Sequence, residues 1–208
     1  MLRDIDNIAF DLGGVVFDID RDLCVRNLEE IGLNEAASLL DLYKQQGDFL
    51  ALEQGEITAA EFFDVLREKC LNKEITDLQI EKALCTFITG LPVRRLEALR
   101  TLRDSGKQVF ALSNTNPIMY HSVIDRLFRQ EGLAINDYFN GIITSFQEKV
   151  CKPQPEIFQI LLRRYSLEPS RTLFIDDSRV NVEAAERNGI KGLYLPENTD
   201  FIELLQLV

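Results

Sequence analysis

The stretch Ile8-Ala9-Phe10-Asp11-Leu12-Gly13-Gly14-Val15 begins as an apolar run and passes through an aspartate into two glycines. A short apolar run that ends at glycines is typical of a strand buried inside a parallel sheet. Late in the chain, Leu173-Phe174-Ile175-Asp176-Asp177 repeats this pattern with two carboxylates. Ligands of open parallel sheets bind outside the carboxyl ends of the strands. Three acids at two strand ends therefore predict a magnesium site, provided that the two strands are neighbours.

The segment from residue 20 to about residue 88 contains no comparable apolar run, and its apolar residues recur at helical spacing. Asp20, Thr58 and Thr76 precede three of these stretches and are suitable N-caps. Gly47 and Gly55 indicate turns. We therefore expect helices at residues 21–31, 35–46, 58–70 and 76–88.

After residue 90 the chain alternates between helical and strand patterns. Strands are expected at residues 108–112, 141–144, 172–175 and 192–195, and helices at 93–104, 117–129, 155–164, 178–188 and 201–207. Together with a first strand at residues 5–12, this alternation predicts an α/β fold, a Rossmann-like parallel sheet with helices on both faces. Because the helical block follows the first strand, we expect residues 1–17 and 90–208 to form a core domain and residues 18–89 to form an inserted all-α cap domain.

The composition narrows the class of protein. The net charge is −11 over 208 residues, which argues against binding to nucleic acid or to an anionic membrane surface. We find no run near the roughly 20 apolar residues of a membrane span, and the first residues lack the apolar run of a signal peptide. The four cysteines form no CxxC pair, so reduced thiols are expected. These features predict a cytoplasmic protein and do not argue against a small phosphorylated metabolite as its partner. We expect a monomer or small homo-oligomer.

Four segments, in this order, resemble the motifs of the haloacid dehalogenase (HAD) superfamily. They are Asp11-Leu12-Gly13-Gly14-Val15, Ser113-Asn114, Lys152 before Pro153, and Asp176-Asp177. The resemblance covers essentially the whole chain and extends to the helical-cap branch, because Leu52-Glu53-Gln54-Gly55-Glu56-Ile57-Thr58 is similar to the cap of that branch. The Ser113-Asn114-Thr115-Asn116 sequence resembles a bacterial subgroup, written DLGxV, that includes sugar-phosphate phosphatase-like members.

The resemblance implies a Mg²⁺-dependent phosphatase that hydrolyses a small phosphorylated metabolite. Asp11 would attack phosphorus, form an aspartyl-phosphate and bind Mg²⁺ with its other oxygen. The backbone carbonyl of Gly13, together with Asp176 and Asp177, would complete the protein ligands of the metal.

The second and third segments would bind the phosphoryl group. Ser113 would donate a hydrogen bond to its oxygens, assisted by the backbone of Asn114. Lys152 would neutralise Asp11 and the phosphoryl group, so that one anion can approach the other. The resemblance thus implies Asp11, Ser113 and Lys152 as catalytic residues, and Ser113, Asn114 and Lys152 as substrate-binding residues.

Gly13 departs from the family pattern, because most family phosphatases carry an aspartate there that acts as general acid and base. Three hypotheses follow. The substrate has a good leaving group, such as a sugar 1-phosphate; another acid, Asp18 or a cap residue, supplies the proton; or the protein is catalytically weak and binds a phosphorylated ligand. A 2-haloacid dehalogenase is a further alternative, but Asp176 and Asp177 favour a metal. The role of Asn181 stays open, and we interpret His121 as an ordinary helix residue.

Overall fold

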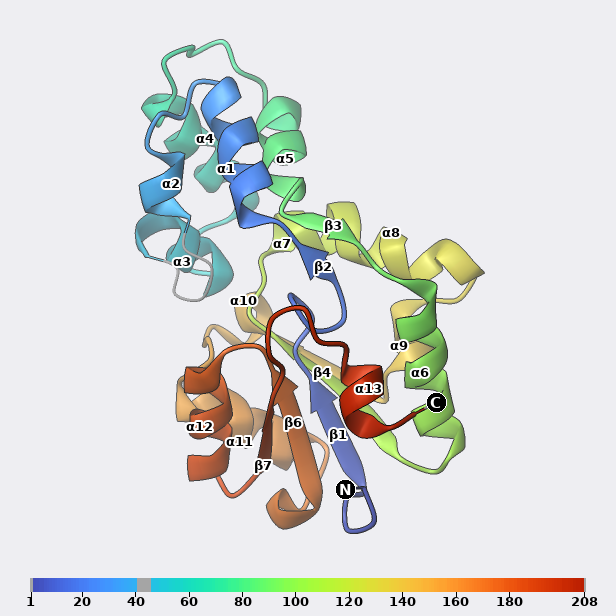
Figure 1. Cartoon of the computed structure of the whole chain (residues 1–208). Coiled ribbons are helices and arrows are strands. Elements are labelled where there is room, and N and C mark those ends of the chain that lie inside the picture. The colour runs from blue at the N-terminus through green and yellow to red at the C-terminus, as the bar shows by residue number, and fades with distance from the viewer. Residues whose placement is uncertain (1, 41–45, 208) are drawn as a thin grey trace.

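The computed structural model describes residues 2–40 and 46–207. At its centre is a five-stranded parallel sheet with the strand order β5-β4-β1-β6-β7 (Figure 1). Strand β1 lies in the middle, and its Ile8 pairs with Val109 of β4 and Leu173 of β6. The polar residues that follow β1, β4 and β6 therefore meet at one edge of the sheet. The strands are β1 (Asn7–Phe10), β4 (Gln108–Ser113), β5 (Gly141–Thr144), β6 (Thr172–Asp176) and β7 (Lys191–Tyr194).

Two apolar layers cover the faces of the sheet, because successive side chains of a strand point to opposite sides. Ile8 and Phe10 belong to a buried cluster with residues of α6, α8, α9 and α13. Ala9 belongs to the opposite cluster, which includes residues of α11 and α12. The predicted fold class is thus confirmed. The helices are α6 (Val93–Asp104), α8 (Asp125–Phe128), α9 (Ile135–Tyr138), α11 (Pro155–Arg164), α12 (Arg179–Arg187) and α13 (Phe201–Leu205).

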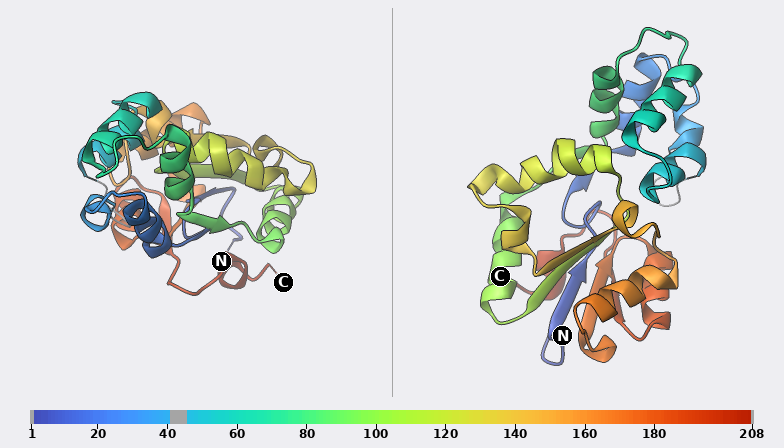
Figure 2. Two further views of the ribbon diagram at one scale, coloured as in Figure 1. Left: turned by 90° about the horizontal axis from the view of Figure 1, so that it is seen from above. Right: turned by 180° about the vertical axis from the view of Figure 1, so that it is seen from behind.

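A block of helices stands beyond the carboxyl ends of the strands, five of them in the described parts of residues 20–86 (Figures 1 and 2). It has its own apolar core, in which the rings of Phe49 and Phe62 meet edge to face at 4.9 Å. Ile118 and Met119 of α7 (Pro117–Met119) belong to the same cluster, so the block packs directly on the segment that follows β4. The helices are α1 (Arg21–Glu30), α2 (Ala36–Leu39), α3 (Gly47–Glu53), α4 (Ala59–Lys69) and α5 (Asp77–Cys85).

Two short strands, β2 (Asp18–Ile19) and β3 (Ile88–Gly90), connect the block to the sheet as an antiparallel pair. The nearby Arg95 is buried and bonds both Asp18 at 2.8 Å and Asp200 at 3.1 Å. A buried guanidinium requires such partners. The junction between the block and the sheet is thus held by ion pairs of Arg95.

Several sequence predictions hold at the residue level. The side chains of Asp20, Thr58 and Thr76 cap α1, α4 and α5, and the two threonines form capping boxes. The helix expected at residues 76–88 ends at Cys85 instead, because Ile88 pairs with Ile19 in the short sheet. This sheet escapes prediction since its strands have only two and three residues.

Three other predictions differ from the structure. The helix expected at residues 35–46 is limited to α2, whose end at Leu40 is extended, and residues 41–45 lie outside the described part of the chain. Gly47, interpreted as a turn residue, begins α3 with a φ of 55°. The helix expected at residues 117–129 is helical but passes through one π-helical turn, Tyr120–Ile124, before α8. In the ranges 2–40 and 46–207, no helix combines the length and apolar character required to cross a bilayer.

Candidate active site

Asp11 follows β1 directly and lies at the carboxyl edge of the sheet. Its backbone N–H donates to the carbonyl of Ile175 at 2.9 Å, which continues the pairing of β1 with β6. One carboxylate oxygen, Oδ1, accepts a 2.7 Å hydrogen bond from the N–H of Leu12. The side chain is 13% exposed. The carboxylate is therefore fixed in position and yet open to a reactant.

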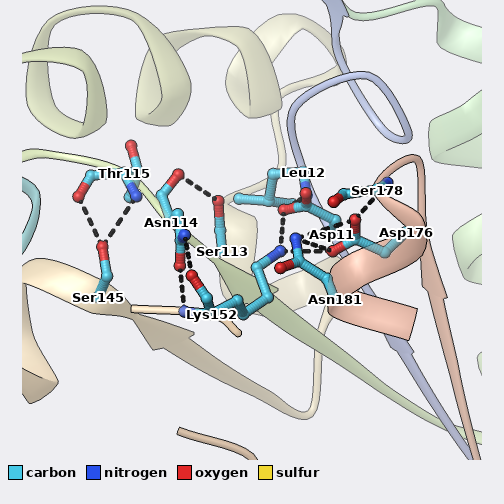
Figure 3. A network of polar contacts seen from close by, with 10 residues as sticks. All are labelled: Asp11, Leu12, Ser113, Asn114, Thr115, Ser145, Lys152, Asp176, Ser178 and Asn181. Carbon is cyan, nitrogen blue, oxygen red and sulfur yellow. Dashed lines mark hydrogen bonds and ion pairs between the residues drawn. The ribbon is translucent and has the colours of Figure 1, made fainter. Parts of the chain in front are cut away.

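Lys152 joins the ends of the two acidic strands (Figure 3). Its Nζ lies 2.9 Å from Oδ1 of Asp11 and 2.8 Å from Oδ2 of Asp176. The lysine side chain is only 1% exposed. Although burial opposes it, the combined field of Asp11 and Asp176 raises the pKa of Lys152. The ammonium thus stays charged beside the reactive carboxylate.

Asp176 is the most enclosed of the acids, with a side chain that is 0% exposed. The N–H of Ser178 donates to its Oδ1 at 2.7 Å. The Nδ2 atom of the buried Asn181 lies 3.2 Å from both oxygens. Together with Lys152, these donors fix both oxygens of the carboxylate. Asn181 therefore contacts Asp176, whereas on sequence a role beside Asp177 and a position on the helix surface were both open.

Asp11, Asp176 and Asp177 form a compact set of oxygen ligands. Each offers one carboxylate oxygen, and these atoms lie within 4.8 Å of one another. Carboxylate oxygen is the ligand type that Mg²⁺ prefers. With Lys152 as the cation of the cluster, three ionised acids leave two negative charges uncompensated, which is the charge that one Mg²⁺ balances. The residues present therefore fit the ion.

The carboxyl groups of Asp11 and Asp177 resist ionisation without a cation. Burial raises the pKa of Asp11 to about 8; Asp176 and Asp177 add to this effect, and Lys152 opposes it. Burial also raises the pKa of Asp177 to about 6, assisted by the charge of Asp176. A carboxylate taken out of water needs either a proton or a cation. The cluster is thus arranged to exchange protons for a metal ion.

The two glycines after Asp11 differ in their surroundings. Gly14 has a φ of 70°, and a Cβ at this position would lie 2.2 Å from Oδ2 of Asp177. Glycine is therefore required for Asp177 to approach the loop. A Cβ at Gly13 would meet only Cγ2 of Ile19 within 4 Å, at an ordinary 3.8 Å. The space next to the Gly13 backbone would thus accept a side chain.

Ser113 and Asn114 lie where β4 ends. Ser113 is buried and its hydroxyl donates to the carbonyl of Asn114 at 3.3 Å. The amide of Asn114 accepts from the N–H of Lys152 at 2.8 Å and donates to the carbonyl of Lys152 at 3.0 Å. The side chain of Asn114 thus holds the backbone of Lys152 in place.

A cavity of about 740 Å³ opens beside Asp177 and Gly14. Its wall includes Asp18, Arg95 and residues 196–200. Asp18, one candidate for the missing acid, is bonded there to Arg95 at 2.8 Å. Its carboxylate is therefore already engaged by a guanidinium.

Glu53, at the end of α3, is a residue for which we predicted no role from the sequence. It is half-buried. Burial raises its pKa to about 7, and the charge of Lys152 opposes the shift. The sequence signal was the stretch at residues 52–58, but nothing in it marked the glutamate. His121, by contrast, is exposed, and its ring meets the ring of Tyr120 edge to face with 5.4 Å between the centroids.

Comparison with known proteins places these observations in context. A family model described as haloacid dehalogenase-like hydrolase matches residues 5–189. D-ribitol-5-phosphate phosphatase of Bacteroides thetaiotaomicron is 38% identical over 194 residues, which cover 93% of either protein. A HAD family enzyme of the same organism, crystallised with magnesium and inorganic phosphate, gives a TM-score of 0.89 at 35% identity and covers 96% of this chain and 98% of its own. A Porphyromonas gingivalis protein, described as a predicted HAD-like family hydrolase, gives 0.89 at 30% identity, with 98% and 97% covered.

Proposed function

The chain belongs to the haloacid dehalogenase-like hydrolase family, and from that premise we propose that Asp11 is the nucleophile of its reaction. The protein is a Mg²⁺-dependent phosphatase that acts on a phosphorylated metabolite. The observation that carries the proposal is the position of Lys152. Its ammonium lies within 3 Å of both Asp11 and Asp176, so the nucleophile and a ligand of the metal share one buried cation.

In the first step an oxygen of Asp11 attacks phosphorus and the bond from phosphorus to the leaving oxygen breaks. The product is an aspartyl-phosphate, and the leaving alcohol requires one proton. Lys152 lowers the repulsion between the carboxylate and the phosphoryl oxygens. The hydroxyl of Ser113 and the N–H of Asn114 donate to those oxygens and hold them in line for transfer.

Asp11, Asp176, Asp177 and the carbonyl of Gly13 would hold Mg²⁺. When bound, the ion neutralises charge on the transferring group. In the second step water attacks phosphorus, loses a proton and releases phosphate, which restores the carboxylate of Asp11. Positioning and charge compensation carry most of such a phosphoryl transfer.

The substrate we propose is a phosphorylated sugar or polyol. D-ribitol 5-phosphate is the first compound to test, because the enzyme of Bacteroides thetaiotaomicron that is named for it matches 93% of this chain. The preference for sugar 1-phosphates derives from Gly13 alone and stays a prediction. Residues 18–89 would act as the cap that covers the substrate. The four free cysteines support a location in the cytoplasm.

The test is a panel of phosphate esters, sugar phosphates and 2-haloacids, with and without Mg²⁺. We expect release of phosphate from a sugar or polyol phosphate that requires Mg²⁺, and loss of turnover in Asp11→Asn with an unchanged circular dichroism spectrum. Asp104→Asn, at an exposed position of α6, is the matched control. Retained activity of Asp11→Asn would refute the mechanism, and release of halide without Mg²⁺ would identify a dehalogenase instead.

A further inference from the structure

The reaction proposed above leaves one proton unassigned, and the following inference rests on that function. The leaving alkoxide of a sugar or polyol phosphate is a strong base, so its expulsion needs a general acid, which typically contributes ~10²–10⁴ in rate. Position 13 is a glycine and offers no acid. Asp18 is bonded to Arg95 at 2.8 Å. The helical block, which faces the carboxyl ends of the strands, is the other part of the chain that can supply an acid.

Helix α3 lies at the end of the block nearest the sheet and contacts α10 (Ser145–Glu148) (Figure 1). The contact is unusually close at Gly55, which has a φ of 60°. A Cβ at Gly55 would lie 2.2 Å from the backbone oxygen of Phe146. The loop after α3 is thus seated directly on the core, two residues beyond Glu53.

The seat of this loop is tied to the segment that binds the phosphoryl group. Phe146 follows Ser145, whose hydroxyl accepts from the N–H of Thr115 at 3.0 Å and donates to its carbonyl at 2.9 Å. Thr115 is two residues from Ser113. One continuous set of contacts therefore places the end of α3 beside the phosphate-binding edge.

The charged surroundings of Glu53 agree with this placement. The charge of Lys152 lowers the pKa of the Glu53 carboxyl. The charges of Glu53 and Glu56 in turn raise the pKa of the Cys151 thiol. Burial raises the pKa of Glu53 to about 7. The carboxyl group can thus both carry and release a proton near neutral pH, as a general acid and base must.

We propose that Glu53, delivered by the helical block, is the general acid and base of the reaction and takes the role that Gly13 leaves vacant. In the first step its carboxyl proton passes to the leaving oxygen as the bond from that oxygen to phosphorus breaks, which leaves the Glu53 carboxylate and a neutral alcohol. In the second step the carboxylate takes a proton from the water that attacks the aspartyl-phosphate. The residue is then ready for the next turnover.

The test compares two leaving groups in Glu53→Gln, which keeps the size of the side chain and removes the proton. D-ribitol 5-phosphate has an alkoxide leaving group, and p-nitrophenyl phosphate has a phenolate that departs without protonation. We expect kcat for the ribitol ester to fall at least 100-fold. The rate constant for release of p-nitrophenol in the first turnover should stay within about threefold of its value in the parent protein. Glu56→Gln, exposed in the same loop, is the matched control and should change neither.

Other outcomes separate the two proposals. If the parent protein hydrolyses neither ester with Mg²⁺, the proposed function fails. If it hydrolyses both, and Glu53→Gln lowers the first-turnover rate constants of both esters equally or raises only KM for the ribitol ester, Glu53 serves folding or binding and the inference is overturned. Circular dichroism and the melting temperature of the variant show that it is folded.

Discussion

Mg²⁺ is expected to stabilise the folded chain by an amount that grows with pH. The pKa of Asp177 is raised to about 6 and that of Asp11 to about 8, both from an ordinary value of 3.8. Between about pH 4 and about pH 8 the folded protein therefore binds more protons than the unfolded chain. In the absence of metal, its stability therefore falls as pH rises from about 4 to about 8.

The magnitude follows from competition between the ion and the protons. At pH 8.5 and a concentration 100 times the Kd, Mg²⁺ would stabilise the fold by about 2.7 kcal/mol, which raises the Tm of a chain of this size by about 5–10 °C. Two pH units below its pKa, Asp11 is protonated about 100 to 1, so the apparent affinity falls roughly 100-fold at pH 6. The same concentration then contributes only about 0.4 kcal/mol, or about 1 °C.

The assay is thermal unfolding followed by circular dichroism at pH 6 and 8.5, with MgCl₂ against NaCl of equal ionic strength. Asp177→Asn should lose most of the Mg²⁺ effect and be more stable than the parent without metal at pH 8.5, because a buried charge is removed. Asp104→Asn should behave as the parent protein does. Equal Mg²⁺ shifts at both pH values, or a full shift in Asp177→Asn, would refute the reasoning.

Two further predictions concern the glycines after Asp11. Gly14→Ala should lose the Mg²⁺ shift in addition to the ~1–2 kcal/mol strain of an alanine at positive φ, whereas Gly132→Ala, with a φ of 78° and open space around it, should show the strain alone; a Mg²⁺ shift that survives in Gly14→Ala would contradict this. The double variant Gly13→Asp/Glu53→Gln should turn over D-ribitol 5-phosphate at least tenfold faster than Glu53→Gln. Equal rates would contradict the inference that an acid at either position protonates the same leaving oxygen.

The sheet was predictable because its signals are local. Apolar runs that end in polar residues predicted β1, β4 and β6. Because parallel strands place their carboxyl ends on one side, Asp11, Ser113 and Asp176 were expected together only if these strands are neighbours. The strand order that makes β4 and β6 the neighbours of β1 is a long-range property. Periodicity along a single segment carries no information about it.

The predicted site was incomplete for the same reason. Asn181 reaches Asp176 because the first turn of α12 returns over the end of β6, and the spacing alone left its partner open. Glu53 lies about 100 residues from Lys152 in the sequence, and the close approach of Gly55 to Phe146 places the end of α3 against the core. Contacts between the inserted block and the core depend on shapes that no motif encodes.

A general acid carried by the helical block would couple its position to the chemistry. Asp11 follows β1, Asp176 ends β6 and Lys152 lies in the turn before α11. Their mutual contacts involve no residue of the block, so the nucleophile is positioned without it. In our proposal, the close approach of Gly55 to Phe146 is what delivers Glu53 to the carboxyl ends of the strands. The proton for the leaving alcohol is then available only over a covered site, where bulk water is excluded. An aspartate at position 13 would donate in either arrangement. Its replacement by glycine thus makes expulsion of a poor leaving group conditional on a seated cap.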